Sequence, residues 1–267
     1  MKQLALFSVI ILTLFASCGG SSERAYVKNP TDDLVRDLYK ESAYSIILHD
    51  MDVDDSGFSN KYYHTYRIIR EKDTLLPGID TTKIVDGKPV IDENAPLTKT
   101  RIPYDSITSK FEVPDRFFRS HENDMGMTIV WKDEKGVHKN TASPPGYNKY
   151  VGNSRYGHWN GGIWQFYGQY MFMSSMFGMM SRPVYYNDYN TYRTSYYGRS
   201  SYYGRNTGSG YSYGTNSSYN KSSNPSFFQR RQSKTGWSSS SSSRTSSSGS
   251  SRYGSSSGRS GGGGFGK

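Results

Sequence analysis

The sequence YSIIL at residues 44–48 and the sequence YYHTYRII at residues 62–69 decide the fold of this 267-residue chain. Both runs are rich in aromatic and β-branched residues, which favour β-strands. The connection between them is polar and contains Gly57. We therefore expect the two runs to be facing strands of one sheet, joined by a turn.

Two further hairpins are expected later in the chain. Residues 83–85 and 88–91 flank Asp86-Gly87, a strong signal for a two-residue turn, and Pro89 places the second strand at a sheet edge. Residues 127–131 and 137–141 flank a second turn, in which Gly136 takes a left-handed conformation.

Helix signals are short and few. The segment that starts at Thr31 predicts a helix with Thr31 as its cap and with Leu34, Val35 and Leu38 on one face. Residues 113–118 predict a second short helix with a proline in its first turn. Residues 31–155 are therefore expected to form a small α+β domain, strand-rich, with antiparallel hairpins and one or two short helices. About 125 residues suffice for one core.

Residues 156–181 differ in composition from the expected domain. They contain no Asp, Glu, Lys or Arg, and residues 163–180 are dense in aromatics and methionine. Glutamines, serines and glycines keep the hydrophobicity below that of a membrane-spanning helix. We expect a helix or a flexible apolar collar.

Residues 182–267 form a basic, low-complexity tail of Tyr, Ser, Gly, Arg and Asn, and the motif Tyr-Tyr-Gly-Arg occurs at 196–199 and 202–205. Few branched aliphatic residues are available to form a core, so disorder is expected. The tail carries a net charge of about +11, whereas residues 1–181 are close to neutral.

The N-terminus carries the features of an export signal. A cationic start is followed by an apolar run of about a dozen residues, too short to span a bilayer. It ends in Phe15-Ala16-Ser17-Cys18, and Cys18 is the only cysteine in the chain. The alternative is a plain signal peptide that is removed together with its cysteine.

This ending resembles the lipobox of bacterial lipoproteins. The resemblance implies a signal peptide at 1–17, cleavage before Cys18, acyl chains on that cysteine and a tether at 18–30. It also implies an outer-membrane location, because Gly19 rather than Asp follows the cysteine. The tail has a compositional likeness to uncharacterised envelope lipoproteins, and no family is indicated for the globular part.

Two hypotheses for metal binding arise. Asp50, Asp52 and Asp54 resemble the start of a calcium-binding loop, although the alternative is a solvated acidic turn. Met171, Met173 and Met176 offer thioethers, which are soft ligands that select copper(I). The alternative for the methionines is an apolar stripe for core, partner or lipid contact.

No catalytic residues are indicated, so we do not expect an enzyme, and no cofactor is implied. The five histidines lack metal spacing, and no nucleophile elbow or phosphate-binding glycine loop occurs.

The tail suggests the partners. Its arginines, among them Arg199, Arg205, Arg230 and Arg231, are interleaved with aromatic residues. They suit anionic envelope polymers or lipids, whereas nucleic acid is not an expected partner in the envelope. The alternative is a solvated spacer. The sequence thus predicts a membrane-anchored envelope module that binds an anionic polymer or lipid. A protein is the alternative partner. Metal handling is the alternative function.

Overall fold

The chain is organised around an antiparallel sheet. The computed structural model describes residues 29–77, 79–85, 88–91, 97–206, 208 and 210–237. Within these residues, six strands form the main sheet: β1 (Tyr44–Asp54), β2 (Lys61–Pro77), β5 (Leu97–Ile107), β6 (Phe111–Val113), β7 (Thr128–Asp133) and β8 (Gly136–His138). Their order is β5-β2-β1-β7-β8, and β6 pairs with the start of β2. With the short helices below, this confirms the α+β class.

The two strands expected from the sequence are the centre of this sheet. β1 pairs with β2 in antiparallel register, from Ser45 opposite Ile69 to Asp54 opposite Lys61. β1 is longer than expected, because residues 50–54, interpreted as a loop, continue the pairing with β2. That interpretation of the acidic residues was therefore wrong.

A bulge interrupts β1 at His49. Leu48 lies opposite Tyr66 and Asp50 lies opposite Thr65, so that His49 is the extra residue of β1. A bulge redirects the side chain of the extra residue and bends its strand. The sequence contained no signal for this irregularity.

Both other predicted hairpins are confirmed. β3 (Ile79–Val85) pairs with β4 (Lys88–Ile91) in a separate two-stranded sheet. In the β7–β8 hairpin, Asp133 lies opposite Gly136. Gly136 has a φ of +124°, a positive value that favours glycine.

The first helix begins earlier than expected. α2 (Pro30–Asp37) is capped by Asn29, whose side chain accepts a hydrogen bond from the Thr31 backbone N–H at 3.0 Å. Thr31 is therefore inside the helix, because Pro30 occupies the first helical position. As expected, Leu38 is buried at the end of this helix. α3 (Asp115–Ser120) follows β6 directly.

Residues 156–181 do not form the expected collar. They begin with a hairpin of β9 (Gly157–Asn160) and β10 (Ile163–Phe166), and continue with the 3₁₀ turn η1 (Gly168–Tyr170) and α4 (Phe172–Met176). The hairpin turns at Gly161-Gly162, both with positive φ. In the described part of the chain, no helix has the length and apolarity needed to cross a membrane.

The C-terminal region is folded as far as residue 237. It contains α5 (Tyr186–Thr191), the π-helical turn η2 (Tyr192–Tyr196), α6 (Ser218–Ser223), α7 (Pro225–Ser233) and η3 (Thr235–Trp237). It buries the aromatic residues Tyr192, Tyr202, Tyr213, Phe227 and Trp237. The expectation of disorder from residue 182 onward is thus wrong for 182–237, because aromatic rings replace the missing aliphatics. Residues 238–267 lie outside the described residues, as do residues 1–28 with Cys18.

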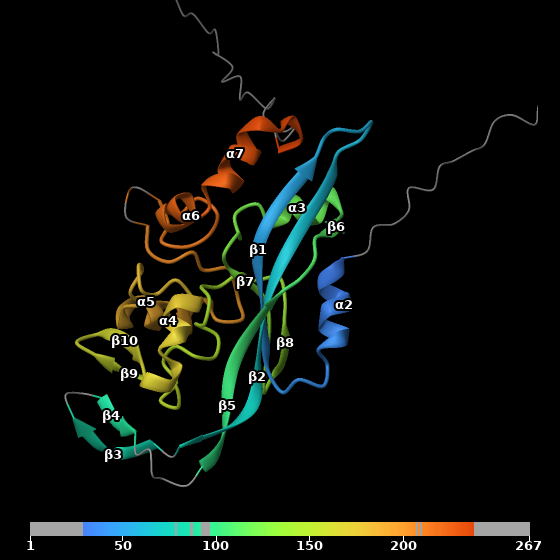
Figure 1. The fold of residues 1–267 in the computed structure, drawn as a ribbon. Coiled ribbons are helices and arrows are strands. Elements are labelled where there is room, and N and C mark those ends of the chain that lie inside the picture. The colour runs from blue at the N-terminus through green and yellow to red at the C-terminus, as the bar shows by residue number, and fades with distance from the viewer. Residues whose placement is uncertain are drawn as a thin grey trace, which may run out of the picture.

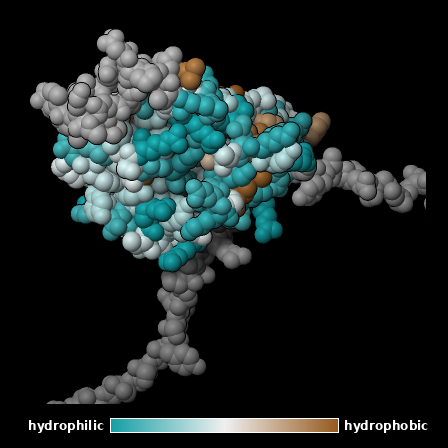
Figure 2. All heavy atoms as spheres, turned by 90° about the horizontal axis from the view of Figure 1, so that it is seen from below, coloured by the Kyte–Doolittle hydropathy of each residue, from teal (hydrophilic) through white to brown (hydrophobic). Residues whose placement is uncertain are grey.

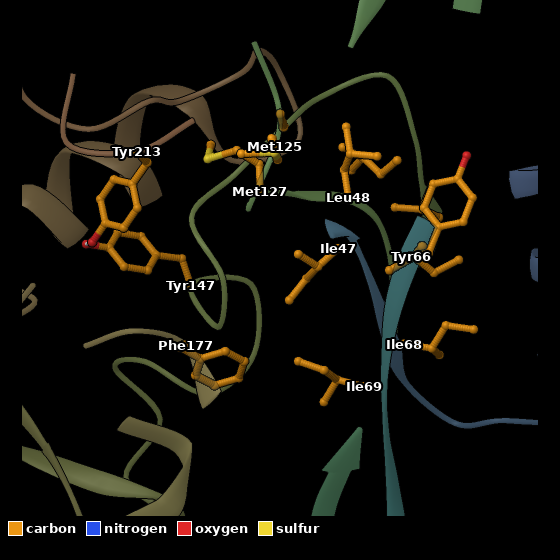
Figure 3. Close-up of a cluster of buried hydrophobic side chains, with 14 of the residues drawn as sticks. Ile47, Leu48, Tyr66, Ile68, Ile69, Met125, Met127, Tyr147, Phe177 and Tyr213 are labelled. Atoms are coloured by element: carbon orange, nitrogen blue, oxygen red, sulfur yellow. The ribbon is translucent and has the colours of Figure 1, made fainter. Parts of the chain in front are cut away.

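The helices cover the sheet from two sides. In Figure 1, α4 to α7 lie on one side of the sheet, and α2 lies on the other. The hydrophobic core lies between the sheet and the side that carries α4 to α7. In Figure 3, Ile47 and Ile69 point from the strands toward the facing segments, which contribute Tyr147, Phe177 and Tyr213. The C-terminal region is therefore part of the same core as the sheet.

Candidate anion-binding cavity

The acidic residues of β1 form ion pairs with the C-terminal helix. Nη2 of Arg230 donates to both carboxylate oxygens of Asp50, at 2.8 and 2.7 Å. Asp52 accepts from Lys234 at 2.8 Å and from Lys110 at 2.5 Å. Burial alone would raise the pKa of Asp52, but the hydrogen bonds from Lys110 and Lys234 hold it below the ordinary value. We call these contacts the β1–α7 clamp.

The calcium hypothesis finds no support in this geometry. Asp54 accepts from the backbone and hydroxyl of Ser56. Asp50, Asp52 and Asp54 extend along a strand, so their carboxylates do not converge on one point. Among the described residues, no group of three His, Cys, Asp or Glu side chains could hold a metal ion.

The three methionines are not brought together either. Met173 is fully buried in the core, Met171 is exposed and Met176 is partly buried. His158 stacks against Tyr167, with ring centroids 5.5 Å apart. The segment contributes to the core mainly through Met173 and Phe177, which are four residues apart; Met176 packs against the core in part, and Phe172 is exposed.

The four tail arginines have different environments. Arg199 and Arg205 are exposed, whereas Arg230 belongs to the β1–α7 clamp. The Arg231 guanidinium lies 5.8 Å from the ring centroid of Trp237. The charge predicted for an external partner is thus partly used inside the fold.

A cavity of about 140 Å³ lies between the sheet and the segments around α4 and α6. We call it the arginine cavity, because Arg67 and Arg182 both line it. Ile47 and Phe177, labelled in Figure 3, contribute apolar wall. Its full lining is Ile47, His49, Arg67, Gly126, Pro145, Met176, Phe177, Gly178, Arg182, Tyr219, Asn220, Ser223 and Asn224.

Arg182 has aromatic and carbonyl partners instead of an acidic one. Its guanidinium lies 4.0 Å from the ring centroid of Tyr213 and 4.5 Å from that of Tyr219. Its Nη1 donates to the Ser212 carbonyl at 3.0 Å. Burial lowers the pKa of Arg182. Among the described residues, no carboxylate lies within ion-pair distance, and Nε is buried without a hydrogen-bond partner.

Arg67 reaches the cavity from β2. Its Nη1 donates to the Met176 carbonyl at 3.1 Å, and its Nε lies 3.4 Å from a carboxylate oxygen of Asp105. This Nε is also buried without a hydrogen bond within the described residues. Arg67 is therefore fixed in position but only partly neutralised.

The bulge residue His49 completes the sheet side of the cavity. Burial lowers the pKa of His49, and the nearby positive charge of Arg67 lowers it further. The ring is therefore mainly neutral near pH 7. A neutral imidazole can donate one hydrogen bond and accept another.

Two glycines allow α6 to lie close to its neighbours: Gly178 in the loop after α4 and Gly126 in the segment before β7. A Cβ on Gly178 would lie 2.6 Å from the Tyr219 hydroxyl, and one on Gly126 would lie 3.0 Å from Nδ2 of Asn220. Both glycines have positive φ. Asn220 is buried and donates to the carbonyls of Met125 and Gly214, which fixes α6 against the sheet.

A second cleft of about 380 Å³ is lined by Glu71 among other residues. The buried carboxylate of Glu71 accepts from Tyr156 at 2.6 Å and pairs with Lys149 at 2.9 Å. This carboxylate is thus already neutralised, unlike the guanidinium of Arg182.

Comparison with protein families, with curated proteins and with solved structures gave no match for this chain. The site therefore has to be interpreted from its own geometry. Sequence reasoning missed Arg67 and Arg182, which are far apart in the chain. The available signal was that Arg182 ends a long uncharged segment, an unusual place for a charge that becomes buried.

Proposed function

We propose that this protein is a lipid-anchored, non-enzymatic binding module of the cell envelope that contacts an anionic surface with one end of its domain. This hairpin end consists of the β1–β2 connection (residues 55–60), β6, α3 and η3. The observation that supports the proposal is that the C-terminal end of the described chain is fixed to the β1–β2 connection, which carries the exposed Phe58, and that the N-terminal helix packs on β6.

Phe58 lies in the β1–β2 connection and is fully exposed. An isolated exposed aromatic residue is unremarkable on its own, but aromatic residues at a protruding tip suit the interface of a membrane. The exposed residue Lys61 follows three positions later. In contrast, the face seen from below in Figure 2 is mostly hydrophilic, with small separate hydrophobic areas.

The C-terminal end of the described chain is fixed to this hairpin. Thr235 and the Gly236 backbone N–H donate to Asp55 at 3.1 and 3.4 Å. The Trp237 ring packs on Phe118 of α3, with centroids 4.9 Å apart. Any chain after Trp237 therefore starts at the hairpin end.

The N-terminal end lies toward the same part of the sheet. α2 packs on β6, and Figure 1 shows its first turn on the β6 side. Residues 18–28 can span at most ~40 Å when fully extended. A lipid on Cys18 would thus keep the hairpin end near the bilayer.

The residues beyond Trp237 add positive charge at this place. Residues 238–267 contain Arg244, Arg252, Arg259 and Lys267 and no acidic residue. Each basic residue near an anionic membrane surface contributes about 1 kcal/mol of attraction. The proposed partners are therefore anionic lipid headgroups or an anionic polymer at the same surface.

Vesicle binding tests this proposal. A Cys18→Ser protein that lacks the acyl chains should bind vesicles with anionic lipid and not neutral vesicles, and salt should weaken the binding. Ending the chain after Trp237 should reduce binding at least about tenfold, from the loss of several charges. Phe58→Ser should reduce it further, whereas Phe172→Ser, at an exposed phenylalanine of α4, is the matched control. Unchanged binding after both changes would refute the proposal.

A further inference from the structure

We propose that the arginine cavity is a binding site for a phosphate group, with Arg67 and Arg182 as its two cationic donors. This site is separate from the proposed surface contact of the hairpin end. Its ligand is either free phosphate or the phosphate of a larger molecule that reaches into the cavity.

The two arginines that line the cavity come from different parts of the fold. Arg67 lies on β2, in the sheet, and Arg182 begins the C-terminal region. Backbone carbonyls of Met176 and Ser212 hold the two guanidinium groups. These carbonyls orient the groups but leave their positive charge in place, so the donors are preorganised for an anion.

The charge balance of the cavity favours an anion. None of its lining residues is Asp or Glu. Arg67 has one carboxylate neighbour, Asp105, and Arg182 has aromatic rings instead. A partly buried cation without a counter-charge is costly. A bound anion would supply that counter-charge, and the buried Nε–H of Arg182, which has no partner among the described residues, shows that donor capacity remains unused.

The arrangement of the donors favours a tetrahedral group over a planar one. Arginine donors, the His49 ring and the polar residues of α6 surround a small space from the sheet side and from the helix side. A phosphate presents oxygens in four directions and can accept from both sides at once, whereas a carboxylate has two oxygens in one plane. Guanidinium groups match phosphate geometry well.

His49 adds a feature that only an anionic ligand would reveal. Burial and the neighbouring positive charge of Arg67 disfavour its protonated form. Asp50 and Asp105, which also face it electrostatically, act in the opposite direction. A bound dianion would favour protonation of the His49 ring, so binding of the dianionic form should be accompanied by proton uptake.

Calorimetry on the full-length protein in detergent tests the assignment. Inorganic phosphate and glycerol 3-phosphate are the probes for free and esterified phosphate, and acetate is the probe for a carboxylate. We expect both phosphates to bind and acetate to bind at least about tenfold more weakly, because fewer charged hydrogen bonds form. Arg67→Gln should weaken phosphate binding about 10- to 100-fold. Arg101→Gln, at an exposed arginine of β5, is the matched control.

A second measurement covers the case in which an arginine variant fails to fold. In the wild-type protein, 10 mM phosphate should raise the melting temperature relative to 10 mM chloride at equal ionic strength. Vesicle binding by the chain that ends at Trp237 is then compared between phosphatidic acid, which carries a phosphomonoester, and phosphatidylglycerol. This comparison distinguishes a lipid phosphomonoester from free phosphate as the ligand of the cavity. The proposal is overturned if phosphate neither binds nor stabilises, or if acetate binds as well as phosphate. In either case the surface contact of the hairpin end would be unaffected.

Discussion

The sheet region (residues 44–133) and the tyrosine region (residues 142–237) both bury a core, but they build it from different side chains. The sheet region uses mainly aliphatic residues such as Ile46, Leu48 and Ile69, all fully buried, beside a few rings such as Tyr66. The tyrosine region uses rings, and Tyr147, Tyr150, Tyr156 and Tyr192 are almost completely buried. The difference shows that a Tyr/Gly/Ser-rich composition can fold when another region supplies an apolar surface.

The tyrosine region is held together by hydroxyl groups as well as by rings. Tyr147 donates to Asp188 at 2.9 Å and shares a hydrogen bond with Tyr213 at 2.9 Å. Tyr202 donates to the other oxygen of Asp188 at 2.6 Å. Asp188 is the only acidic residue after Arg182. A buried tyrosine needs such a partner, and one carboxylate here serves two.

The largest effect should come from removing the tyrosine region. A chain that ends at Met180 loses the buried rings of Tyr192, Tyr202, Tyr213 and Phe227. Losing one buried aromatic side chain costs about 3–5 kcal/mol, and domains are stable by only about 5–15 kcal/mol. We expect circular dichroism to show a chain that does not melt cooperatively. The chain that ends at Trp237 is the control and should melt like the full protein.

A single substitution should weaken the tyrosine region by a smaller amount. Asp188→Ala removes the carboxylate that accepts from the hydroxyls of Tyr147 and Tyr202, at a cost of about 2–5 kcal/mol. Urea unfolding measures this loss of stability. Asp73→Ala, at an exposed acid of β2, is the control. Equal stabilities for the two variants would contradict the role given to the hydroxyl network.

The sheet region should respond to acid through His64. This histidine is fully buried, its Nε2 has no partner within the described residues, and burial lowers its pKa from 6.5 to about 3. Between these values the unfolded chain binds a proton that the folded chain does not. Stability should fall as the pH drops from 6.5 toward 3, by at most about 1.4 kcal/mol per pH unit.

Urea unfolding at several pH values checks the role of His64. His64→Phe should remove most of this dependence, whereas His158→Gln should keep it. An unchanged acid dependence in His64→Phe would show that other groups cause it.

The smallest effect should come from the β1–α7 clamp, which joins the two regions at the surface. Lys234→Gln removes one partner of Asp52 and should cost about 1 kcal/mol or less. Because the folded pKa of Asp52 is lowered, its contribution is present above about pH 4 and is lost as the pH falls through the folded pKa. Thermal melting at low and high salt checks this, with Lys221→Gln as control.

The sheet was predictable because its signals are local. The runs at 44–48 and 62–69 and the turn at 133–136 each contain the residues that their conformation requires. The bulge at His49 and the extension of β1 to Asp54 were not predictable, because they depend on pairing with β2. The same holds for the fold of 182–237, since its rings pack on residues distant in the chain.

The candidate site could not be found from the sequence for a related reason. Arg67 and Arg182 are separated by more than a hundred residues, and nothing in their immediate neighbours marks a cavity. The acidic residues of β1 showed the opposite problem. Their local pattern suggested a metal, whereas the fold pairs Asp50 and Asp52 with Arg230 and Lys234.

The central claim is that the tyrosine region belongs to the same folded unit as the sheet. Hydrogen exchange followed by mass spectrometry tests this claim most directly. Applied to the intact protein under native conditions, it compares peptides from residues 186–237 with peptides from β1 and β2. We predict slow exchange at the hydrogen-bonded amides of both, with protection lost together as urea is added. Fast exchange throughout 186–237, beside a protected sheet, would contradict the account.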